Sequence, residues 1–265
     1  MLNKAAAKGR LPSIRIQWKQ ILLPCALLLL WQWITVNGLV KPILLPSPVQ
    51  VLDAFVVMVN NGELAVHLGT SIIRVLAGFA LAALLGVGLG MTLGLFPFMF
   101  ELLYGLIQLI RPIPPLAWLP LAILWFGIEE GSKIFIIILG SFFPIFTNVL
   151  DGIRQTDHKF VELSRVLEVP RGKFVTQVVI PGALPFILTG LRIGLGYAWM
   201  CVLAAELSAG MKGIGYMLSD ARALAQTDRV LVGMLSIGVI GKIMDSILRT
   251  LESKIIRWRE SFTGV

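Results

Sequence analysis

Two arginines lie inside long apolar runs of this sequence, where a charged side chain is costly and is therefore a candidate for function. Arg111 falls within the run 99–126. Arg192 falls about ten residues into the run 182–206, roughly 15 Å along a helix that rises 1.5 Å per residue. Two cations at such depth would suit the passage of a small anion. The competing interpretation is that each arginine only pairs with a carbonyl group or with a carboxylate such as Glu206.

Prolines interrupt the first of these runs directly after its arginine. Pro112, Pro114 and Pro115 remove backbone donors and leave carbonyl groups unpaired, which lipid does not tolerate. This backbone should therefore be buried against protein or line a wet cavity, and a broken helix near mid-bilayer is how many transporters build a site. The alternative is a kink that neighbouring side chains fill. We expect the two arginines and these three prolines to line a translocation pathway.

Residues that could catalyse a reaction or hold a metal are few. The only histidines, His67 and His158, are predicted to lie on opposite sides of the membrane, so the pair cannot ligate one metal ion or haem. The adjacent carboxylates Glu129 and Glu130 precede a predicted helix and are expected to cap its start rather than to catalyse. No catalytic residue, metal or cofactor is therefore expected in this chain.

ATP binding by this chain is also disfavoured. A P-loop needs the pattern Gly-x-x-x-x-Gly-Lys-Ser/Thr, whose backbone N–H groups hold the phosphates. The Gly-Lys pairs at 172–173 and 241–242 are followed by Phe174 and Ile243, and neither has the upstream glycine. If ATP drives this protein, another polypeptide binds it.

The elements that position these residues are predicted to be membrane-spanning helices. Hydrophobic residues make up 57% of the 265 residues, charged residues only 14%, and the mean hydropathy is +0.85, a balance that a water-soluble protein could not cover with polar surface. Several apolar runs reach the roughly 20 residues that a helix needs to cross a bilayer. We expect an all-α integral membrane protein with six transmembrane helices, at approximately 20–38, 69–95, 99–126, 132–150, 182–206 and 228–248.

Basic residues predict the orientation of these helices. Of the 23 Lys and Arg residues, fourteen fall in the two ends and in 151–180, and five fall in segments of the opposite side. Because Lys and Arg collect in cytoplasmic loops, both termini are expected to be cytoplasmic. The net charge of +8 reflects this topology better than it reflects nucleic acid binding. We divide the chain into a cytoplasmic segment, 1–19, a single transmembrane domain, 20–250, and a cytoplasmic tail, 251–265.

The segment after the first span is expected to form a helix along the outer membrane surface. Ser47 can cap it, Pro48 suits its first turn, and Val51, Phe55 and Met58 recur at helical spacing. A plain loop is the alternative.

The second span carries glycines four residues apart, at Gly86, Gly90 and Gly94. Small residues at this spacing let helix backbones approach closely in lipid. They predict a packing seam, which could face either the same bundle or a second copy of the chain.

A polar, basic segment separates the fourth and fifth spans. Its apolar residues recur at three- and four-residue spacing and predict a short surface helix over 157–167, with the stripe Phe160, Leu163, Val166 and Leu167. The opposite face carries Glu162 and Arg165, Pro170 and Gly172 break the helix, and a second helical run leads into Pro181. Such a helix could dock a cytoplasmic partner and pass its motion to the bundle, or it could simply rest on lipid.

The same segment resembles the EAA loop of ATP-binding cassette importer permeases. That pattern is Glu-Ala-Ala-x-x-x-Gly, nine further residues, then Ile-x-Leu-Pro. Glu162 takes the Glu position, Leu163 and Ser164 replace the alanines, Pro181 matches outright, and the spacing agrees without insertion. Two further positions match conservatively, Val178 and Ile180.

One departure from the pattern concerns the turn, because Glu168 stands at the family glycine. Glycine commonly adopts the left-handed conformation that ends a helix, so its absence puts the geometry of this turn in question. Pro170 with Gly172 could end the helix instead. The resemblance implies that the coupling contacts with an ATPase come from Glu162, Leu163, Ser164, Arg165, Val166, Leu167, Glu168, Val169 and Pro181.

The resemblance extends from about Trp31 to Arg259. The stretches "RPIPPLAWLPLAILWFGI", "SKIFIIILGSFFPIF" and "PGALPFILTGLRIGLGYAW" are similar to permeases of the nitrate, sulfonate, taurine and bicarbonate importers, most closely those for aliphatic sulfonates. The likeness implies a type I ABC importer permease fold (MetI-like) in a bacterial inner membrane, with a coupling helix between helices 4 and 5. It also implies a dimer of permeases, two ATPase subunits that bind ATP and Mg, and a solute-binding protein outside.

The expected function is therefore import of a small anion, an aliphatic sulfonate, by alternating access. Taurine, nitrate, bicarbonate or a vitamin precursor are alternatives that this chain cannot separate, because selectivity in such systems lies largely in the binding protein. A membrane enzyme or an electron-transfer subunit is the rival from another class.

Overall fold

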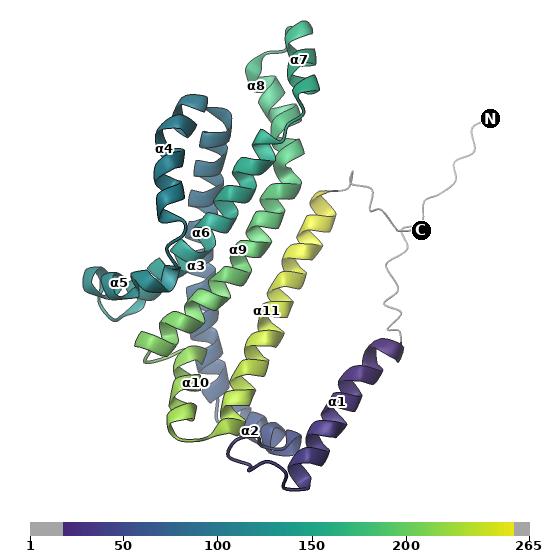
Figure 1. Cartoon of the computed structure of the whole chain (residues 1–265), viewed down its shortest axis with the longest axis vertical. Coiled ribbons are helices and arrows are strands. Elements are labelled where there is room, and N and C mark those ends of the chain that lie inside the picture. Colours follow the sequence, from purple (N-terminus) through teal and green to yellow (C-terminus); the bar gives the residue numbers. More distant parts are fainter. Residues whose placement is uncertain (1–17, 257–265) are drawn as a thin grey trace, which may run out of the picture.

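The computed structural model of the protein describes residues 18–256, and every regular element in that range is a helix (Figure 1). The elements, in chain order, are α1 (Trp18–Val36), α2 (Pro48–Asn60), α3 (Glu63–Leu95), α4 (Pro97–Ile110), η1 (Pro115–Trp118), α5 (Leu119–Phe126), α6 (Glu130–Arg154), α7 (His158–Val166), α8 (Arg171–Phe174), η2 (Val175–Val179), α9 (Ile180–Ala209), α10 (Ile214–Ala223) and α11 (Thr227–Ile255).

Four helices are long and apolar enough to cross a membrane. They are α3, α6, α11 and the continuous helix Arg171–Ala209, which joins α8, η2 and α9. Each overlaps a predicted span and extends beyond it, so four of the expected spans are confirmed: 69–95, 132–150, 182–206 and 228–248.

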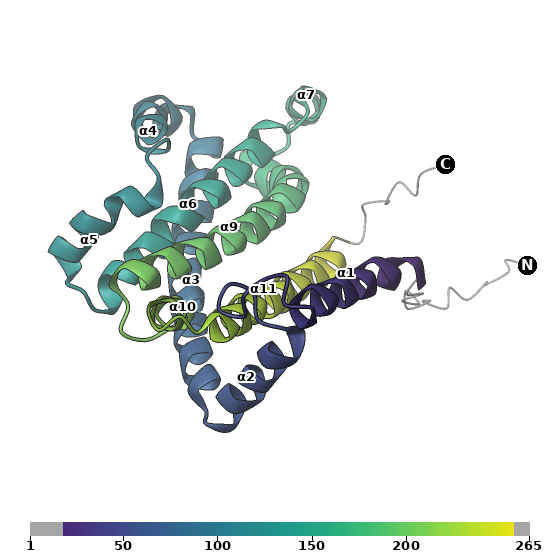
Figure 2. The ribbon, with the colours of Figure 1, turned by 60° about the horizontal axis from the view of Figure 1, so that its bottom comes forward.

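The expected span 99–126 is broken, as its prolines predict. α4 and the pair η1–α5 meet at an angle of 85°. Consequently α5 projects sideways from the bundle in two views (Figures 1 and 2). If the bent pair counts as one span, the described residues contain five candidate spans.

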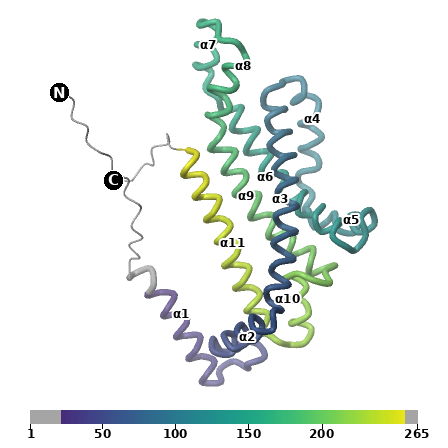
Figure 3. The backbone as a smooth tube through the Cα atoms, turned by 180° about the vertical axis from the view of Figure 1, so that it is seen from behind, coloured from purple at the N-terminus to yellow at the C-terminus, as the bar shows by residue number. Residues whose placement is uncertain are grey.

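The first helix, α1, stands apart from the bundle when the molecule is seen from the front and from behind (Figures 1 and 3). Its described apolar part, Leu22–Val36, is shorter than a full span. One tie to the rest of the chain is the indole of Trp31, whose Nε1 donates to the carbonyl of Pro46 at 3.0 Å. The sixth predicted span therefore stays a prediction.

The segment before α3 is a helix and not a plain loop. Ser47 and Gln50 form a capping box, in which the Ser47 side chain accepts from the Gln50 N–H and the Gln50 side chain accepts from the Ser47 N–H. Val51 and Met58 are buried against α10 and α11, while Phe55 is 43% exposed. The predicted apolar stripe is thus correct at two of its three residues.

The glycines of α3 form a seam within the chain. Gly86, Gly90 and Gly94 lie so close to α6 that an added Cβ would fall between 2.8 and 2.9 Å from its side chains. The side chains that cover them are Ile145, Val149 and Ile153. The question left open by the sequence is therefore resolved: this seam packs α3 on α6 rather than on a second copy.

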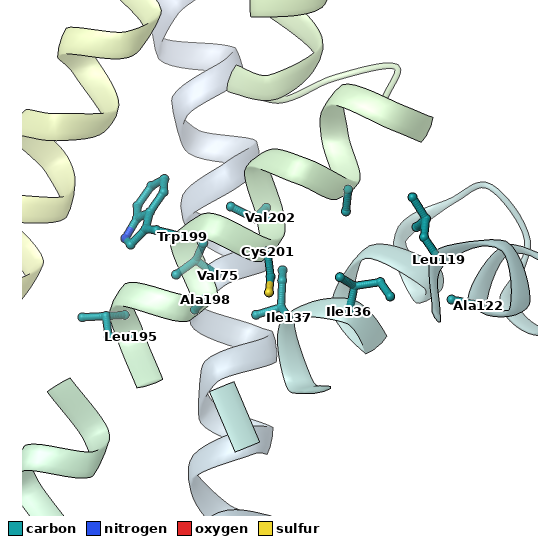
Figure 4. Packing of buried hydrophobic residues seen from close by; sticks show 11 residues of the cluster. Val75, Leu119, Ala122, Ile136, Ile137, Leu195, Ala198, Trp199, Cys201 and Val202 are labelled. Carbon is teal, nitrogen blue, oxygen red and sulfur yellow. The ribbon is translucent and has the colours of Figure 1, made fainter. Parts of the chain in front are cut away.

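The central core lies where α3, α6 and α9 meet. Val75, Ile137 and Val202, one from each helix, belong to a single buried cluster (Figure 4). Leu119 and Ala122 of α5 join the same cluster, so the sideways helix is anchored on the bundle. Because lipid supplies no hydrophobic drive between helices, such close packing is what holds them together.

Candidate functional site

The segment that resembles the EAA loop folds as α7, a tight turn and α8. Asp157 caps α7, because its side chain accepts from the N–H of Lys159 at 2.9 Å. The figures place α7 at one end of the molecule, beyond the ends of α3, α6 and α11 (Figure 1).

The turn after α7 keeps the conformation that the family glycine would provide. Glu168 has a φ of +50°, in the left-handed region. Its N–H donates to the carbonyl of Arg165 at 3.2 Å, and the N–H of Val169 donates to the carbonyl of Ser164 at 2.9 Å. These two bonds make a Schellman motif, so the doubt raised by the missing glycine is removed. Pro170 does not replace the turn but stands at the N-cap of α8.

The apolar stripe of α7 is exposed in the described chain. Leu163 is 53% exposed, Val166 is 80% exposed and Leu167 is 64% exposed. A short helix that shows this much apolar surface beside Glu162 and Arg165 suits contact with another protein or with a lipid surface.

Behind the turn lies a cleft of about 870 Å³ between α7–α8 and the ends of α3 and α6. Basic side chains contribute to its wall, namely Arg154, Arg165 and Arg171. The guanidinium of Arg154 also lies 3.7 Å from the ring centre of Phe100, which ties the end of α6 to α4.

Pro181 does not interrupt the helix that carries α8 into the membrane. The five residues before Ile180, Val175–Val179, form a π-helical turn, and the N–H of Ile180 donates to the carbonyl of Val175. A wider turn suits the approach to a proline, whose ring would otherwise meet the carbonyl one turn earlier. The surface segment and α9 are therefore one continuous helix of 39 residues.

At the break between α4 and α5, Arg111 and Pro115 line a cavity of about 320 Å³. The opposite wall comes from α6 and α9 and includes Asn148 and Tyr197. Pro112 and Pro114 lie in the connection but do not line this cavity. Polar groups of Arg111, Thr147 and Asn148 share this lining with apolar side chains, so the broken backbone borders a cavity.

Arg192 does not join Arg111 at this cavity. Its side chain pairs with Asp245 at 3.4 Å and with Glu252 at 3.3 Å, both on α11, and it does not contact Glu206. Because Glu252 lies three residues before the end of α11, Arg192 faces the last turns of that helix. Lys242 also pairs with Asp245, at 3.8 Å, so Asp245 lies between two cations.

A buried ion cluster at the other end of α9 was not recognised as a site from the sequence. Arg74 is 3% exposed and Glu206 is 1% exposed, and Arg74 Nη1 donates to Glu206 Oε1 at 2.7 Å. Arg74 Nε donates to Glu130 Oε2 at 2.6 Å, which joins α6 to the cluster. Ser71 Oγ donates to the Glu206 carboxylate at 2.8 Å. Glu129 stands at the N-cap of α6 and Glu130 in its first turn, as expected, but Glu129 makes no side-chain cap bond and the carboxylate of Glu130 binds Arg74.

The signal for this cluster was present in the sequence. Arg74 and Glu206 carry opposite charges inside two different apolar runs, and a buried charge requires a partner. Three glycines, Gly210, Gly213 and Gly215, follow the glutamate within ten residues, which is typical of backbone that must approach a side chain closely.

Comparison with known proteins identifies the family. Residues 86–257 match the family described as "binding-protein-dependent transport system inner membrane component". The chain belongs to this family.

Its relatives include an aliphatic sulfonates transport permease of Bacillus subtilis (strain 168), which is 41% identical over 99% of this chain and 100% of that protein. The taurine transport system permease of Escherichia coli (strain K12) is 36% identical over 94% of this chain and 96% of that protein. The fold is similar to an inward-facing MetNI methionine ABC transporter, with a TM-score of 0.55 and 18% identity over 71% of this chain and 91% of that chain.

The chain is thus a multi-pass permease subunit of an ABC importer, embedded in the membrane. It is not an enzyme, because ATP hydrolysis in these transporters belongs to a separate subunit. Its partners include that ATPase and a binding protein.

Proposed function

We propose that this permease imports an aliphatic sulfonate by alternating access. The observation that carries the proposal is the likeness to an aliphatic sulfonates permease over the whole chain. Taurine is itself an aminosulfonate, so the taurine permease favours the same anionic group. Arg111, at the cavity beside the broken helix, is the cation best placed to meet that group.

ATP would act through the surface helix. We propose that α7 docks in a groove of the ATPase through residues 162–169, since this helix ends in the Schellman turn and exposes its apolar stripe. The continuous helix Arg171–Ala209 would carry the motion of α7 past the cavity to the far end of the bundle.

The experiment reconstitutes the permease with its ATPase and binding protein in liposomes and measures ATP-dependent uptake of labelled ethanesulfonate, taurine and nitrate. We expect uptake of the sulfonates. Uptake of nitrate alone would contradict the substrate proposal but not the importer assignment.

A double variant tests the coupling. Glu162→Ala with Leu163→Arg should abolish ATPase association or binding-protein-stimulated hydrolysis, because it removes one charge and one exposed apolar group of α7. The matched control, Asp220→Ala with Leu224→Arg, makes the same changes at exposed positions of α10 and its end. Unchanged association and turnover in the first variant would show that α7 is only a surface helix.

We further propose that the chain crosses the membrane six times, with both termini in the cytoplasm of a bacterial cell, and that two permeases form a dimer. Fourteen of the 23 basic residues favour this orientation. Labelling of single cysteines with a membrane-impermeant maleimide tests it: a cysteine at Asn37 should react from outside and one at Lys159 only from inside. Cross-linking of the purified permease tests the number of copies.

A further inference from the structure

The cleft behind α7 combines apolar side chains with basic ones. It lies between α7–α8 and the ends of α3 and α6, and its volume of about 870 Å³ is within the roughly 300–1,000 Å³ that small-molecule sites occupy. Its apolar lining includes Leu95, Ile153 and Val179, of which the last two are each 5% exposed. The cleft therefore has the size and the mixed lining of a site for an amphipathic molecule.

α7 presents two different faces. The residues of this helix and its turn that line the cleft recur at three- and four-residue spacing, and they are Val161, Ser164, Arg165 and Glu168. The exposed apolar stripe of α7 contributes no residue to the cleft. An ATPase bound to the stripe would therefore leave the cleft on the other face of the helix.

Positive charge is in excess around the cleft. Arg154, Arg165 and Arg171 line it together with one carboxylate, that of Glu168. Within residues 18–256, none of these three arginines forms an ion pair. His158 also lines the cleft and can only add to the positive charge. An anionic group is therefore the ligand that this charge favours.

Arg154 is held in place without being neutralised. Its guanidinium lies 3.7 Å from the ring centre of Phe100, and this contact with a ring face fixes the cation but supplies no hydrogen-bond acceptor in the plane of the guanidinium. The N–H donors of arginine form a rigid fork that matches the oxygens of a phosphate group. We therefore take a phosphate group as the chemistry that the cleft recognises.

The level of the cleft indicates that this phosphate comes from the membrane. α3 ends at Leu95 and α6 ends at Arg154, and α7 and α8 lie beyond these ends (Figures 1 and 3). The basic-residue pattern predicts that this end is cytoplasmic, where basic pockets between spanning helices bind anionic headgroups. A free phosphate ion would use the arginines alone, whereas a phospholipid also covers the apolar lining.

We propose that the cleft binds an anionic phospholipid of the cytoplasmic leaflet. Arg154, Arg165 and Arg171 hold its phosphate group, and the start of an acyl chain covers the apolar side chains. The bound lipid connects α7 to the ends of α3 and α6 and so restrains the surface helix against the bundle. This site does not depend on which solute the permease carries.

The test removes lipid from the purified complex of permease and ATPase in a neutral detergent, adds phosphatidylglycerol, and measures bound lipid by native mass spectrometry. We expect phosphatidylglycerol to bind at least tenfold more tightly than phosphatidylcholine, whose choline group balances the phosphate charge. The double variant Arg154→Gln with Arg171→Gln should weaken phosphatidylglycerol binding at least tenfold and retain the ATPase. The matched control, Lys159→Gln with Lys173→Gln, removes the same charge from exposed residues outside the cleft and should bind as wild type does.

Three results would overturn the proposal. Equal affinity for phosphatidylglycerol in the double variant and its control would show that the cleft does not hold the lipid. Displacement of the lipid by inorganic phosphate or glycerol phosphate would make a soluble phosphate the ligand instead. Loss of the ATPase from the double variant would assign the arginines to the interface with that subunit.

A second variant avoids the contact between Arg154 and Phe100, whose loss could disturb folding. Arg171→Glu reverses one charge at an exposed residue and should lower the affinity for phosphatidylglycerol at least fivefold. An unchanged affinity in this variant would also overturn the site.

Discussion

The packing of α3 on α6 predicts opposite effects for two glycines only two residues apart. A Cβ added at Gly90 would lie 2.8 Å from Val149 Cβ and 3.0 Å from the carbonyl oxygen of Phe146. At Gly88 an added Cβ meets nothing within 4 Å. The atoms facing Gly90 belong to the backbone or are attached directly to it, so they cannot move aside without moving α6.

The magnitude follows from two competing terms. Overpacking a tight site costs about 1–3 kcal/mol. Replacing glycine by alanine within a helix gains about 0.5–1 kcal/mol. We therefore expect Gly88→Ala to raise the free energy of unfolding by up to about 1 kcal/mol, and Gly90→Ala to lower it by about 1–2 kcal/mol.

Unfolding in mixed micelles with increasing SDS, followed by tryptophan fluorescence, measures both variants against wild type; the chain has 7 tryptophans. The comparison within one helix cancels changes in helix propensity. Equal stability in the two variants would refute the close approach of α3 and α6.

Three further predictions concern other parts of the chain. Glu168→Gly should raise the free energy of unfolding by about 0.5–1 kcal/mol, because glycine adopts a φ of +50° without strain. Coupling to the ATPase should persist in this variant. A loss of stability in thermal unfolding would contradict the Schellman turn. Arg111→Gln should lower sulfonate uptake at least tenfold with normal assembly, because Arg111 lines the cavity at the broken helix, while Lys242→Gln, 71% exposed, should not; full uptake in the first variant would end the pathway role of Arg111. Ser47→Ala should lower the free energy of unfolding by about 1 kcal/mol, because α2 loses its N-cap. The same SDS unfolding measures this change, and an unchanged stability would contradict the capping box.

Much of the helical framework could be predicted because it depends on local composition. Apolar runs predicted four of the spans, and three clustered prolines after Arg111 indicated the break, because each of these signals lies within one continuous segment of the sequence. The cap at Ser47 is equally local. The angle of 85° at the break could not be predicted, because it depends on how α5 packs against α6.

The sites depend on contacts between distant segments and were harder to predict. Arg192 was expected about 15 Å deep, on the assumption that its helix enters the membrane near residue 182. That helix begins at Arg171. The partners of the Arg192 side chain, Asp245 and Glu252, lie on α11, and no local sequence pattern predicts how α11 is aligned against α9. The cluster around Glu206 was missed for the same reason, because it joins side chains up to 135 residues apart.

The continuous helix Arg171–Ala209 has a mechanical consequence. At 1.5 Å per residue its 39 residues span about 58 Å, nearly twice the hydrocarbon thickness. α6 packs closely against the middle of this helix, from the contact of Gly152 with Phe186 to the contact of Gly140 with Cys201. The helix continues for about 22 Å toward α7 and for about 12 Å beyond Cys201, where Arg74 holds Glu206. The end at α7 therefore stands about twice as far from the packed middle as the other end, so a tilt about that middle would displace the α7 end about twice as far.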